Sequence, residues 1–300
     1  MAETAMYQPA RSARAQWQRV RGVRYRLHCW GPASGRALVL LHGWMDTGLT
    51  WQFLVDALAG ERRVVAPDWR GFGESDWAPG DYYFPDYLGD LDALLDAIAG
   101  DDADAPVDLV GHSMGGNVAG LYAGVRPGRI RRLVLVEGFG ARARAPEEAP
   151  ENYARWLEQW RQPPSLREPE SLAAFADRLK LRHPHLTRER ALFVAQCWLQ
   201  RSADGGWRLR ADPGHKRSNP VLYRLEEAEA CWRQIAAPTL WVVGRESRTL
   251  SWFGGWEELE RRRRLIGAQL ELIDSAGHMI HHDQPQALAR SIEAFVNEPG

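Results

Sequence analysis

The sequence predicts an α/β protein with a mostly parallel sheet that is covered by helices on both faces. Short apolar runs bounded by turn residues recur along the 300-residue chain. These runs are apolar throughout, as strands buried on both faces are, whereas half-exposed strands alternate. Segments with apolar residues at helical spacing separate the runs, and this alternation of strand and helix is typical of such a sheet.

The expected sheet starts with an antiparallel hairpin at Trp17 to Trp30. The buried strands predicted after it are Ala37 to Leu41, Arg63 to Pro67, Val107 to Val110, Arg131 to Val136 and Thr239 to Val243, and the apolar run Leu270 to Ile273 is expected to be the last strand. The clearest helical pattern between them is formed by Tyr87, Leu91, Leu94, Leu95 and Ile98, which fall on one face of a helix.

The alternation stops after Gly140, where a long segment rich in Pro, Arg, Glu and Trp has helical patterns and no buried strand. We therefore expect residues 1–140 and 233–300 to form the core, and residues 141–232 to be a helical insertion. An insertion at the carboxyl edge of a parallel sheet covers the place where such folds bind ligands, so its predicted role is that of a lid.

Composition excludes several classes of protein. Hydrophobic residues make up 45% of the chain, charged residues 26%, and the formal net charge is -1. This is the profile of a globular protein without the positive field that attracts nucleic acid. The run Arg261 to Arg264 is interpreted as the solvated face of a helix. No segment has the length of a secretory signal or a membrane span, which predicts a cytoplasmic protein.

The three cysteines, Cys29, Cys197 and Cys231, lie far apart in the sequence. Their number and spacing fit neither a disulfide framework nor a zinc knuckle. We interpret them as small buried hydrophobic residues.

The strongest chemical signal is the G-x-S-x-G motif at Gly111 to Gly115, between an apolar strand and a helix predicted to begin near Asn117. A sharp turn from strand to helix exposes the serine at the edge of the sheet and needs glycines where strand and helix pack closely. Ser113 is therefore the candidate nucleophile, and the amino terminus of the helix favours the negative charge of a tetrahedral intermediate.

A second loop is expected beside this turn, because Leu40 to Trp44 closes the first long apolar strand. The backbone N–H groups of Trp44 and Met114 are the predicted oxyanion hole, each donor being worth roughly 3 kcal/mol in such sites. His42 is expected to bond within its own loop and to transfer no proton. The loop Asp68 to Ser75 is expected to shape the region behind the pocket.

His278 is the candidate general base, because it follows the last predicted strand on a short loop that can reach the nucleophile. His281, His282 and Asp283 lie on one short loop without a distant partner, so no metal site is predicted there. No organic cofactor is predicted either.

Four motifs follow one another along the chain: Leu41 to Trp44, Asp68 to Ser75, Gly111 to Gly116 and Gly277-His278. In this order and spacing they resemble the α/β-hydrolase superfamily, and the resemblance covers nearly the whole chain outside the insertion. The resemblance implies a sheet of about eight strands with a helical lid. Leu135 to Gly140, the following Pro-Glu-Glu stretch and Gly206 to Pro213 more narrowly resemble the serine hydrolase-like branch. That branch implies an esterase-like or otherwise unassigned hydrolase.

The third member of the triad departs from the pattern of the resembled family. That family is expected to carry an aspartate three residues after the glycine that ends the strand following the lid, and here Ser247 occupies that position. Two carboxylates are alternatives, Glu137 at the tip of the preceding strand and Glu246 on the loop. We favour Glu137, because an acid at a strand tip holds an imidazole more rigidly than one on a loop.

The expected reaction is hydrolysis of an ester or a similar small acyl compound through an acyl-serine intermediate. The abundant tryptophans, among them Trp44, Trp51 and Trp69, indicate either an aromatic-lined pocket for an apolar substrate or simple core packing. Alternatives on the same residues are acyl transfer and carbon–carbon bond hydrolysis. A protein that keeps this fold as a non-catalytic ligand pocket is a further alternative.

Overall fold

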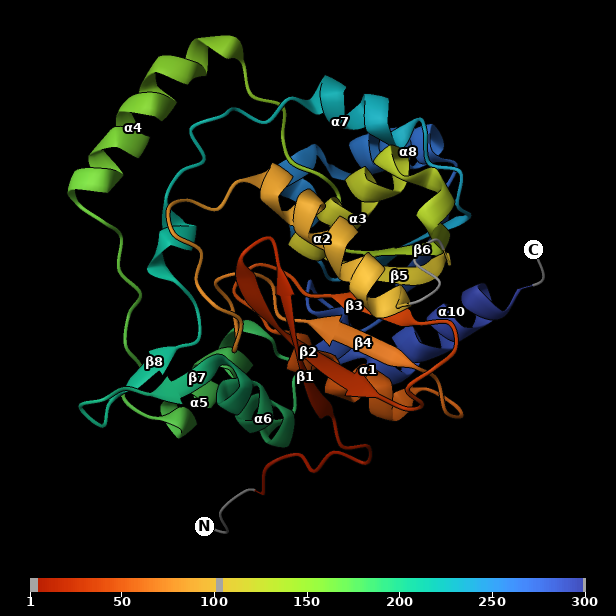
Figure 1. Cartoon of the computed structure of the whole chain (residues 1–300), viewed down its shortest axis with the longest axis horizontal. Coiled ribbons are helices and arrows are strands. Elements are labelled where there is room, and N and C mark those ends of the chain that lie inside the picture. Colours follow the sequence, from red (N-terminus) through yellow and green to blue (C-terminus); the bar gives the residue numbers. More distant parts are fainter. Residues whose placement is uncertain (1–4, 101–104, 299–300) are drawn as a thin grey trace.

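The computed structural model describes residues 5–100 and 105–298, and its centre is a sheet of eight strands (Figure 1). In spatial order the strands are β1 (Arg14–Val20), β2 (Val23–Trp30), β4 (Val64–Pro67), β3 (Leu38–Leu41), β5 (Val107–His112), β6 (Ile130–Val136), β9 (Thr239–Gly244) and β10 (Gln269–Ile273). From β4 to β10 all neighbours are parallel, while β2 is antiparallel to both β1 and β4. The predicted fold class is confirmed.

The hairpin at the edge of the sheet follows from its turn. Val20 pairs with Val23, so the loop has two residues, and Arg21 and Gly22 both have positive φ, 47° and 83°. Two-residue turns of this kind match the twist of the strands they join. β2 alternates in burial at its start and is buried throughout where it pairs with β4.

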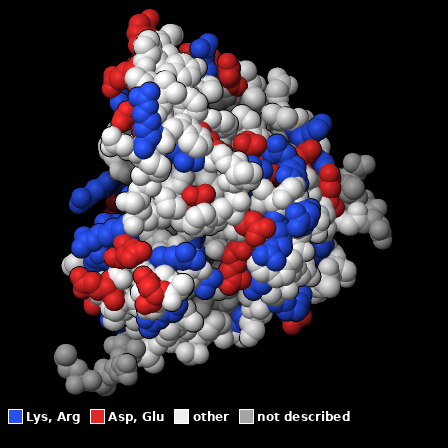
Figure 2. Space-filling view, turned by 60° about the vertical axis from the view of Figure 1, so that its left-hand side comes forward, with Lys and Arg blue, Asp and Glu red and all other residues white. Residues whose placement is uncertain are grey.

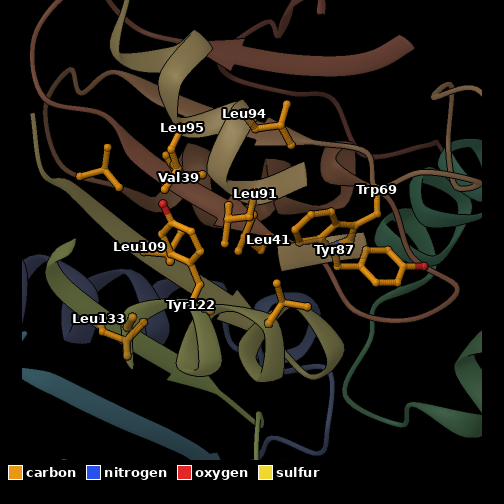
Figure 3. Packing of buried hydrophobic residues seen from close by; sticks show 14 of the residues in the cluster. Val39, Leu41, Trp69, Tyr87, Leu91, Leu94, Leu95, Leu109, Tyr122 and Leu133 are labelled. Atoms are coloured by element: carbon orange, nitrogen blue, oxygen red, sulfur yellow. The ribbon is translucent and has the colours of Figure 1, made fainter. Parts of the chain in front are cut away.

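Helices cover both faces of the sheet, as predicted. One face carries α2 (Phe84–Ala99), α3 (Met114–Val125) and α8 (Gly255–Ile266), and the other carries α1 (Gln52–Ala57) and α10 (Pro285–Asn297). Figure 3 shows the first of these layers, where side chains of α2 meet those of β3 and β5. All five residues of the predicted α2 pattern are buried.

Residues 141–232 lie outside the eight-stranded sheet. They contain α4 (Ala149–Arg161), α5 (Leu172–Arg182), α6 (Arg188–Trp198) and α7 (Leu225–Trp232), together with a small hairpin of β7 (Leu199–Arg201) and β8 (Trp207–Leu209). The insertion is therefore not purely helical. α4 extends away from the sheet in Figure 1, α5 and α6 pack on Phe53 of α1, and α7 packs against α3. The division into core and lid stays a prediction.

Short helices complete the described chain. These are the 3-10 turns η1 (Gly48–Trp51), η2 (Pro127–Arg129), η3 (Pro146–Glu148), η4 (Pro213–Lys216) and η5 (Thr249–Phe253), and the α-helical turn α9 (Ile280–Asp283). Within the described residues, no helix has the length and apolarity required to cross a bilayer.

Charged residues of both signs are interspersed on the face shown in Figure 2, which agrees with the net charge of -1. The predicted solvated run on α8 is wrong at one position. Arg262 is 2% exposed, because its guanidinium turns inward and donates to the carbonyl of Phe139 and to Glu258. Arg261 and Arg264 are exposed, as expected.

The cysteines are free thiols, and Cys29 and Cys197 are buried as predicted. Cys231 is only half-buried, which differs from the expectation. Burial raises the pKa of the Cys197 thiol well above its ordinary value and raises that of Cys29. Both thiols therefore stay protonated near neutral pH, which makes them poor nucleophiles.

A buried ion pair joins the hairpin, the loop after β4 and α2. Arg70 donates to Asp90 over 2.6 Å, Tyr25 donates to the same carboxylate, and the Asp90 side chain is 0% exposed. We expect Asp90→Ala to lower the free energy of unfolding by about 3–5 kcal/mol, because it deprives a buried guanidinium of the carboxylate to which it donates hydrogen bonds. Urea unfolding measures this change.

Asp76→Ala is the matched control, since Asp76 pairs with Arg24 at the surface, where both side chains are about half exposed. Exposed pairs contribute about 0–1 kcal/mol. Equal losses of unfolding free energy in Asp90→Ala and Asp76→Ala would contradict the expectation that burial makes the Arg70–Asp90 pair the stronger one.

Candidate active site

Ser113 occupies the tight turn between β5 and α3, with φ 50° and ψ -115°. α3 begins at Met114, directly after the serine, rather than near Asn117 as predicted. A Cβ on Gly111 would lie 2.4 Å from the carbonyl oxygen of Gly115, which explains the glycines of the motif. A positive φ at a serine is strained, and such strain persists where the surroundings enforce it.

The loop after β3 lies against this turn. A Cβ on Gly43 would lie 2.8 Å from His112 Nδ1 and 3.2 Å from the Cβ of Ser113, so a larger residue would crowd the serine turn. His42 holds the loop, because its Nδ1 bonds to the carbonyl of Gly43 over 2.7 Å and its Nε2 accepts from the N–H of Trp69 over 2.8 Å. Burial lowers the pKa of His42. A neutral ring with both nitrogens occupied has the structural role that the sequence predicts.

The two amides predicted as an oxyanion hole belong to residues next to the serine turn and to the loop that lies against it. Met114 is the first residue of α3, so its N–H has no partner within the helix. Trp44 follows Gly43, at which an added Cβ would closely approach Ser113.

His278 lies on the loop between β10 and α9, and the residue before the serine ties this loop to the turn. His112 Nε2 donates to the carbonyl oxygen of His278 over 2.8 Å, and the two rings are 4.8 Å apart. Within the described residues, the Ser113 hydroxyl makes no hydrogen bond to His278. Catalytic hydrogen bonds are often long before substrate binds and tighten with it.

Glu137 meets the imidazole of His278. The glutamate directly follows β6, is 2% exposed and has φ 54°. Its Oε2 lies 3.0 Å from His278 Nδ1, and its Oε1 accepts from the N–H of Gly244 over 2.8 Å. A carboxylate in this position orients the ring and stabilises its cationic form.

Ser247 and Thr249 complete the surroundings of this pair. The Ser247 hydroxyl donates to Glu137 Oε2 over 2.5 Å, and the Thr249 hydroxyl lies 3.1 Å from His278 Nδ1. Ser247 occupies the position where the resembled family carries its aspartate, but a serine cannot carry the charge. Its offset of three residues from Gly244 nevertheless indicates a place beside the acid, and the structure has it there.

Glu246, the alternative acid, points elsewhere. Its Oε2 is 2.7 Å from His185 Nε2, and its side chain is 57% exposed. His185 belongs to the segment between α5 and α6, so this pair joins the insertion to the loop after β9. His112 is the other residue near the site that sequence reasoning missed, because the middle positions of G-x-S-x-G give no local signal of their contacts.

The tryptophans named in the sequence divide between core and surface. Trp51 and Trp69 are 0% exposed and belong to the two layers of the core. Trp44 is 51% exposed and follows Gly43 in the loop that lies against the serine turn. The expectation of core packing therefore holds for two of the three, and Trp44 alone among them is exposed.

The loop Asp68 to Ser75 lines a cavity of about 240 Å³ under α6, together with Thr47 and Cys197. Its first carboxylate is fully engaged, since Asp68 accepts from the N–H groups of Gly48 and Glu74. Neither Ser113 nor His278 is among the lining residues. This loop therefore holds the turn from Asp46 to Gly48 in place, through the hydrogen bond from Gly48 to Asp68.

In the part of the chain that the structure describes, one group of three possible metal ligands comes together, formed by Asp46, His281 and His282. Asp283, which the sequence grouped with these histidines, accepts instead from the N–H of Gly277 over 3.0 Å.

Several histidines have a lowered pKa, chiefly because burial disfavours the cation; they are His42, His112, His183, His215 and His282. For His215 the pKa falls from 6.5 to about 3. Below pH 6.5 the unfolded chain therefore binds protons that the folded chain does not. We expect stability to be full above pH 6.5 and to fall as the pH drops toward 3.

Urea midpoints measured between pH 8 and pH 5 test this expectation. His215→Phe, which keeps a ring stacked between Phe72 and Tyr82, should weaken the dependence. A midpoint that stays constant below pH 6.5 in the unmodified protein would contradict it.

Comparison with known proteins agrees with this architecture. Residues 36–285 match the family described as the alpha/beta hydrolase fold. The serine hydrolase-like protein of Danio rerio is 24% identical, covering 93% of this chain and 86% of that protein. The sn-1-specific diacylglycerol lipase ABHD11 of Mus musculus is 27% identical, covering 89% and 82%.

Among solved structures, the thioesterase domain from the curacin biosynthetic pathway superposes with a TM-score of 0.81 and 27% identity, covering 94% of this chain and 99% of that domain. The three relatives carry the names of hydrolases. With the family matched over residues 36–285 and the sheet, turn and histidine loop arranged as described, this chain belongs to the α/β-hydrolase fold family.

Proposed function

We propose that this chain is a serine hydrolase that cleaves esters of small apolar acyl compounds through an acyl intermediate on Ser113. The observation that carries the proposal is the 3.0 Å contact between Glu137 and His278, on a loop that His112 ties to the serine turn. A nucleophile, a base and a group that orients the base are the parts that this chemistry requires.

In the first step, His278 takes the proton of the Ser113 hydroxyl while its oxygen attacks the carbonyl carbon. Glu137 stabilises the imidazolium that forms. The N–H groups of Trp44 and Met114 bind the negative oxygen, and the partial positive charge at the start of α3 adds to that stabilisation. His278 then gives its proton to the leaving alcohol, and the bond between carbonyl carbon and leaving oxygen breaks.

In the second step, His278 takes a proton from water, and the hydroxide adds to the acyl-serine carbonyl. Collapse of this second intermediate breaks the bond to Ser113 and returns the proton to its oxygen. The free acid leaves, and the site is ready for another cycle.

Residues 141–232 act in this proposal as a lid that shapes the acyl pocket. Two contacts support this role: Trp198 of α6 donates to Asp46 over 2.8 Å, and His185 pairs with Glu246. Both partners lie on loops that follow core strands near the site. The half-exposed Trp44 offers an apolar surface for the acyl chain.

An ester is favoured as the substrate class, because the relatives named above include a lipase and a thioesterase. A lipase breaks an acyl bond to oxygen, and a thioesterase breaks an acyl bond to sulfur. The two reactions differ in whether an alcohol or a thiol leaves.

A panel of p-nitrophenyl esters of increasing chain length, with matched thioesters, tests the function. We expect a burst of one p-nitrophenol per chain, followed by steady release of free acid. Added methanol distinguishes acyl transfer, because a transferase forms the methyl ester in preference to the acid. A protein that only binds ligands would show no burst, and that result would overturn the proposal.

A further inference from the structure

Two consecutive histidines just after His278 meet an aspartate from the other end of the chain. His281 and His282 belong to α9, whereas Asp46 lies in the loop between β3 and η1. One possible ligand atom from each residue lies within 4.8 Å of the others, and the three residues are 0–2% exposed. From the sequence, no metal site is predicted here, because the two histidines have no distant partner. In the structure Asp46, 235 positions away from His281, is that partner.

We propose that Asp46, His281 and His282 bind one zinc ion. Two imidazoles and one carboxylate form a ligand set that zinc accepts, with a fourth position for water or a further side chain. Calcium and magnesium prefer oxygen ligands, so they fit this site less well.

The spacing of the first two ligands matches a zinc site. Asp46 Oδ2 and His281 Nε2 are 3.3 Å apart. Two atoms that each lie about 2.0–2.1 Å from one tetrahedral zinc ion are about 3.3–3.4 Å from each other. The ion therefore fits between them with little movement, and His282 needs only to bring one ring nitrogen closer.

Hydrogen bonds already orient the carboxylate as they do in metal sites. Asp46 Oδ1 accepts from the N–H of Thr47, the hydroxyl of Thr50 and Nε1 of Trp198, at 2.7–2.8 Å. Those donors occupy one oxygen and leave Oδ2 facing His281. Such outer contacts fix the orientation of a ligating group and raise its affinity.

An unpaired ring nitrogen provides a second, independent observation. His282 Nε2 is buried and has no hydrogen-bond partner within the described residues. Buried polar atoms are almost always paired, so such atoms call for an explanation. Zinc bound at His282 Nε2 would give that nitrogen a partner, while His281 would bind through Nε2 and carry its proton on Nδ1.

The site lies next to the proposed catalytic residues without including them. The ring of His281 is 4.5 Å from that of His112, which in turn bonds to the backbone of His278. A bound ion would link the loop that follows Trp44 to the helix that follows His278. It would thereby stabilise both sides of the site.

Zinc titration of the full chain, prepared without a histidine tag and dialysed against a chelator, tests the proposal. Calorimetry should show one ion per chain. At a hundredfold excess over Kd, Tm should rise by about 4 °C for a chain of this length. His282→Gln should weaken binding at least about 100-fold, since even an outer contact accounts for about 10–100-fold.

His185→Gln is the matched control, because His185 is a partly exposed histidine that pairs with Glu246 outside the cluster. It should bind zinc as the unmodified protein does. If His282→Gln does not fold, Trp198→Phe, which removes one donor to Asp46, should weaken binding about tenfold. No binding by the unmodified chain, or equal binding by the unmodified chain and these cluster variants, would overturn the proposal.

Discussion

Replacing Ser113 by alanine is expected to lower kcat by about 10⁶-fold, because the nucleophile that forms the acyl intermediate is lost. The variant should fold, since alanine is nearly as small as serine and adopts the backbone torsions of this turn at a similar cost. A fluorophosphonate probe, which forms a covalent bond to an activated serine, measures the loss directly. It should label one site per chain in the unmodified protein and none in Ser113→Ala.

Ser251→Ala is the control for this experiment. Ser251 is an exposed serine of η5 whose hydroxyl donates to the carbonyl of Arg248, so its removal should leave labelling unchanged. Labelling that persists in Ser113→Ala would mean that another residue is the nucleophile, and the proposed mechanism would then fall.

The sheet and the serine turn were predictable because their signals are local. A strand buried on both faces is apolar along its length, as β3 is at every position. A strand that passes into a helix through one residue needs glycines where the two backbones touch, as Gly111 and Gly115 do. These requirements act within a few residues and leave a direct trace in the sequence.

Other features depend on partners far along the chain and leave no such trace. Arg262 is buried because the carbonyl of Phe139 and Glu258 receive its donors, whereas a run of four arginines resembles a solvated surface. The small hairpin β7–β8 has strands of three residues each, too short for a periodic pattern to reveal. The meeting of Asp46 with His281 likewise appears only once the chain has folded.

The choice between Glu137 and Glu246 has the second large expected effect. Glu137→Gln should lower kcat by about 10⁴-fold with little change in KM, because the lost charge acts on the imidazolium of the transition state. Glu246→Gln should change kcat less than about twofold, since an exposed pair with His185 contributes little. Steady-state kinetics on an activated ester measures both, and a larger loss in Glu246→Gln would transfer the role of the acid.

Ser247 permits a sharper test than deletion. Its hydroxyl oxygen is 2.5 Å from Glu137 Oε2, the oxygen that contacts His278. An aspartate at position 247 therefore brings a carboxylate to nearly the same place from β9 instead of β6. In the Glu137→Gln background, Ser247→Asp should restore kcat by about 100-fold, because what the histidine requires is a nearby negative charge that accepts from Nδ1.

Ser247→Asp alone should lower activity instead. Two carboxylates would then compete for one buried space, and their repulsion raises the pKa of one of them, so the pair binds a proton near neutral pH. The activity of the single variant should therefore depend on pH more steeply than that of the double variant. If the double variant is no more active than Glu137→Gln, a negative charge near Nδ1 is not sufficient, and the carboxylate must be held at position 137, where it also accepts from Gly244.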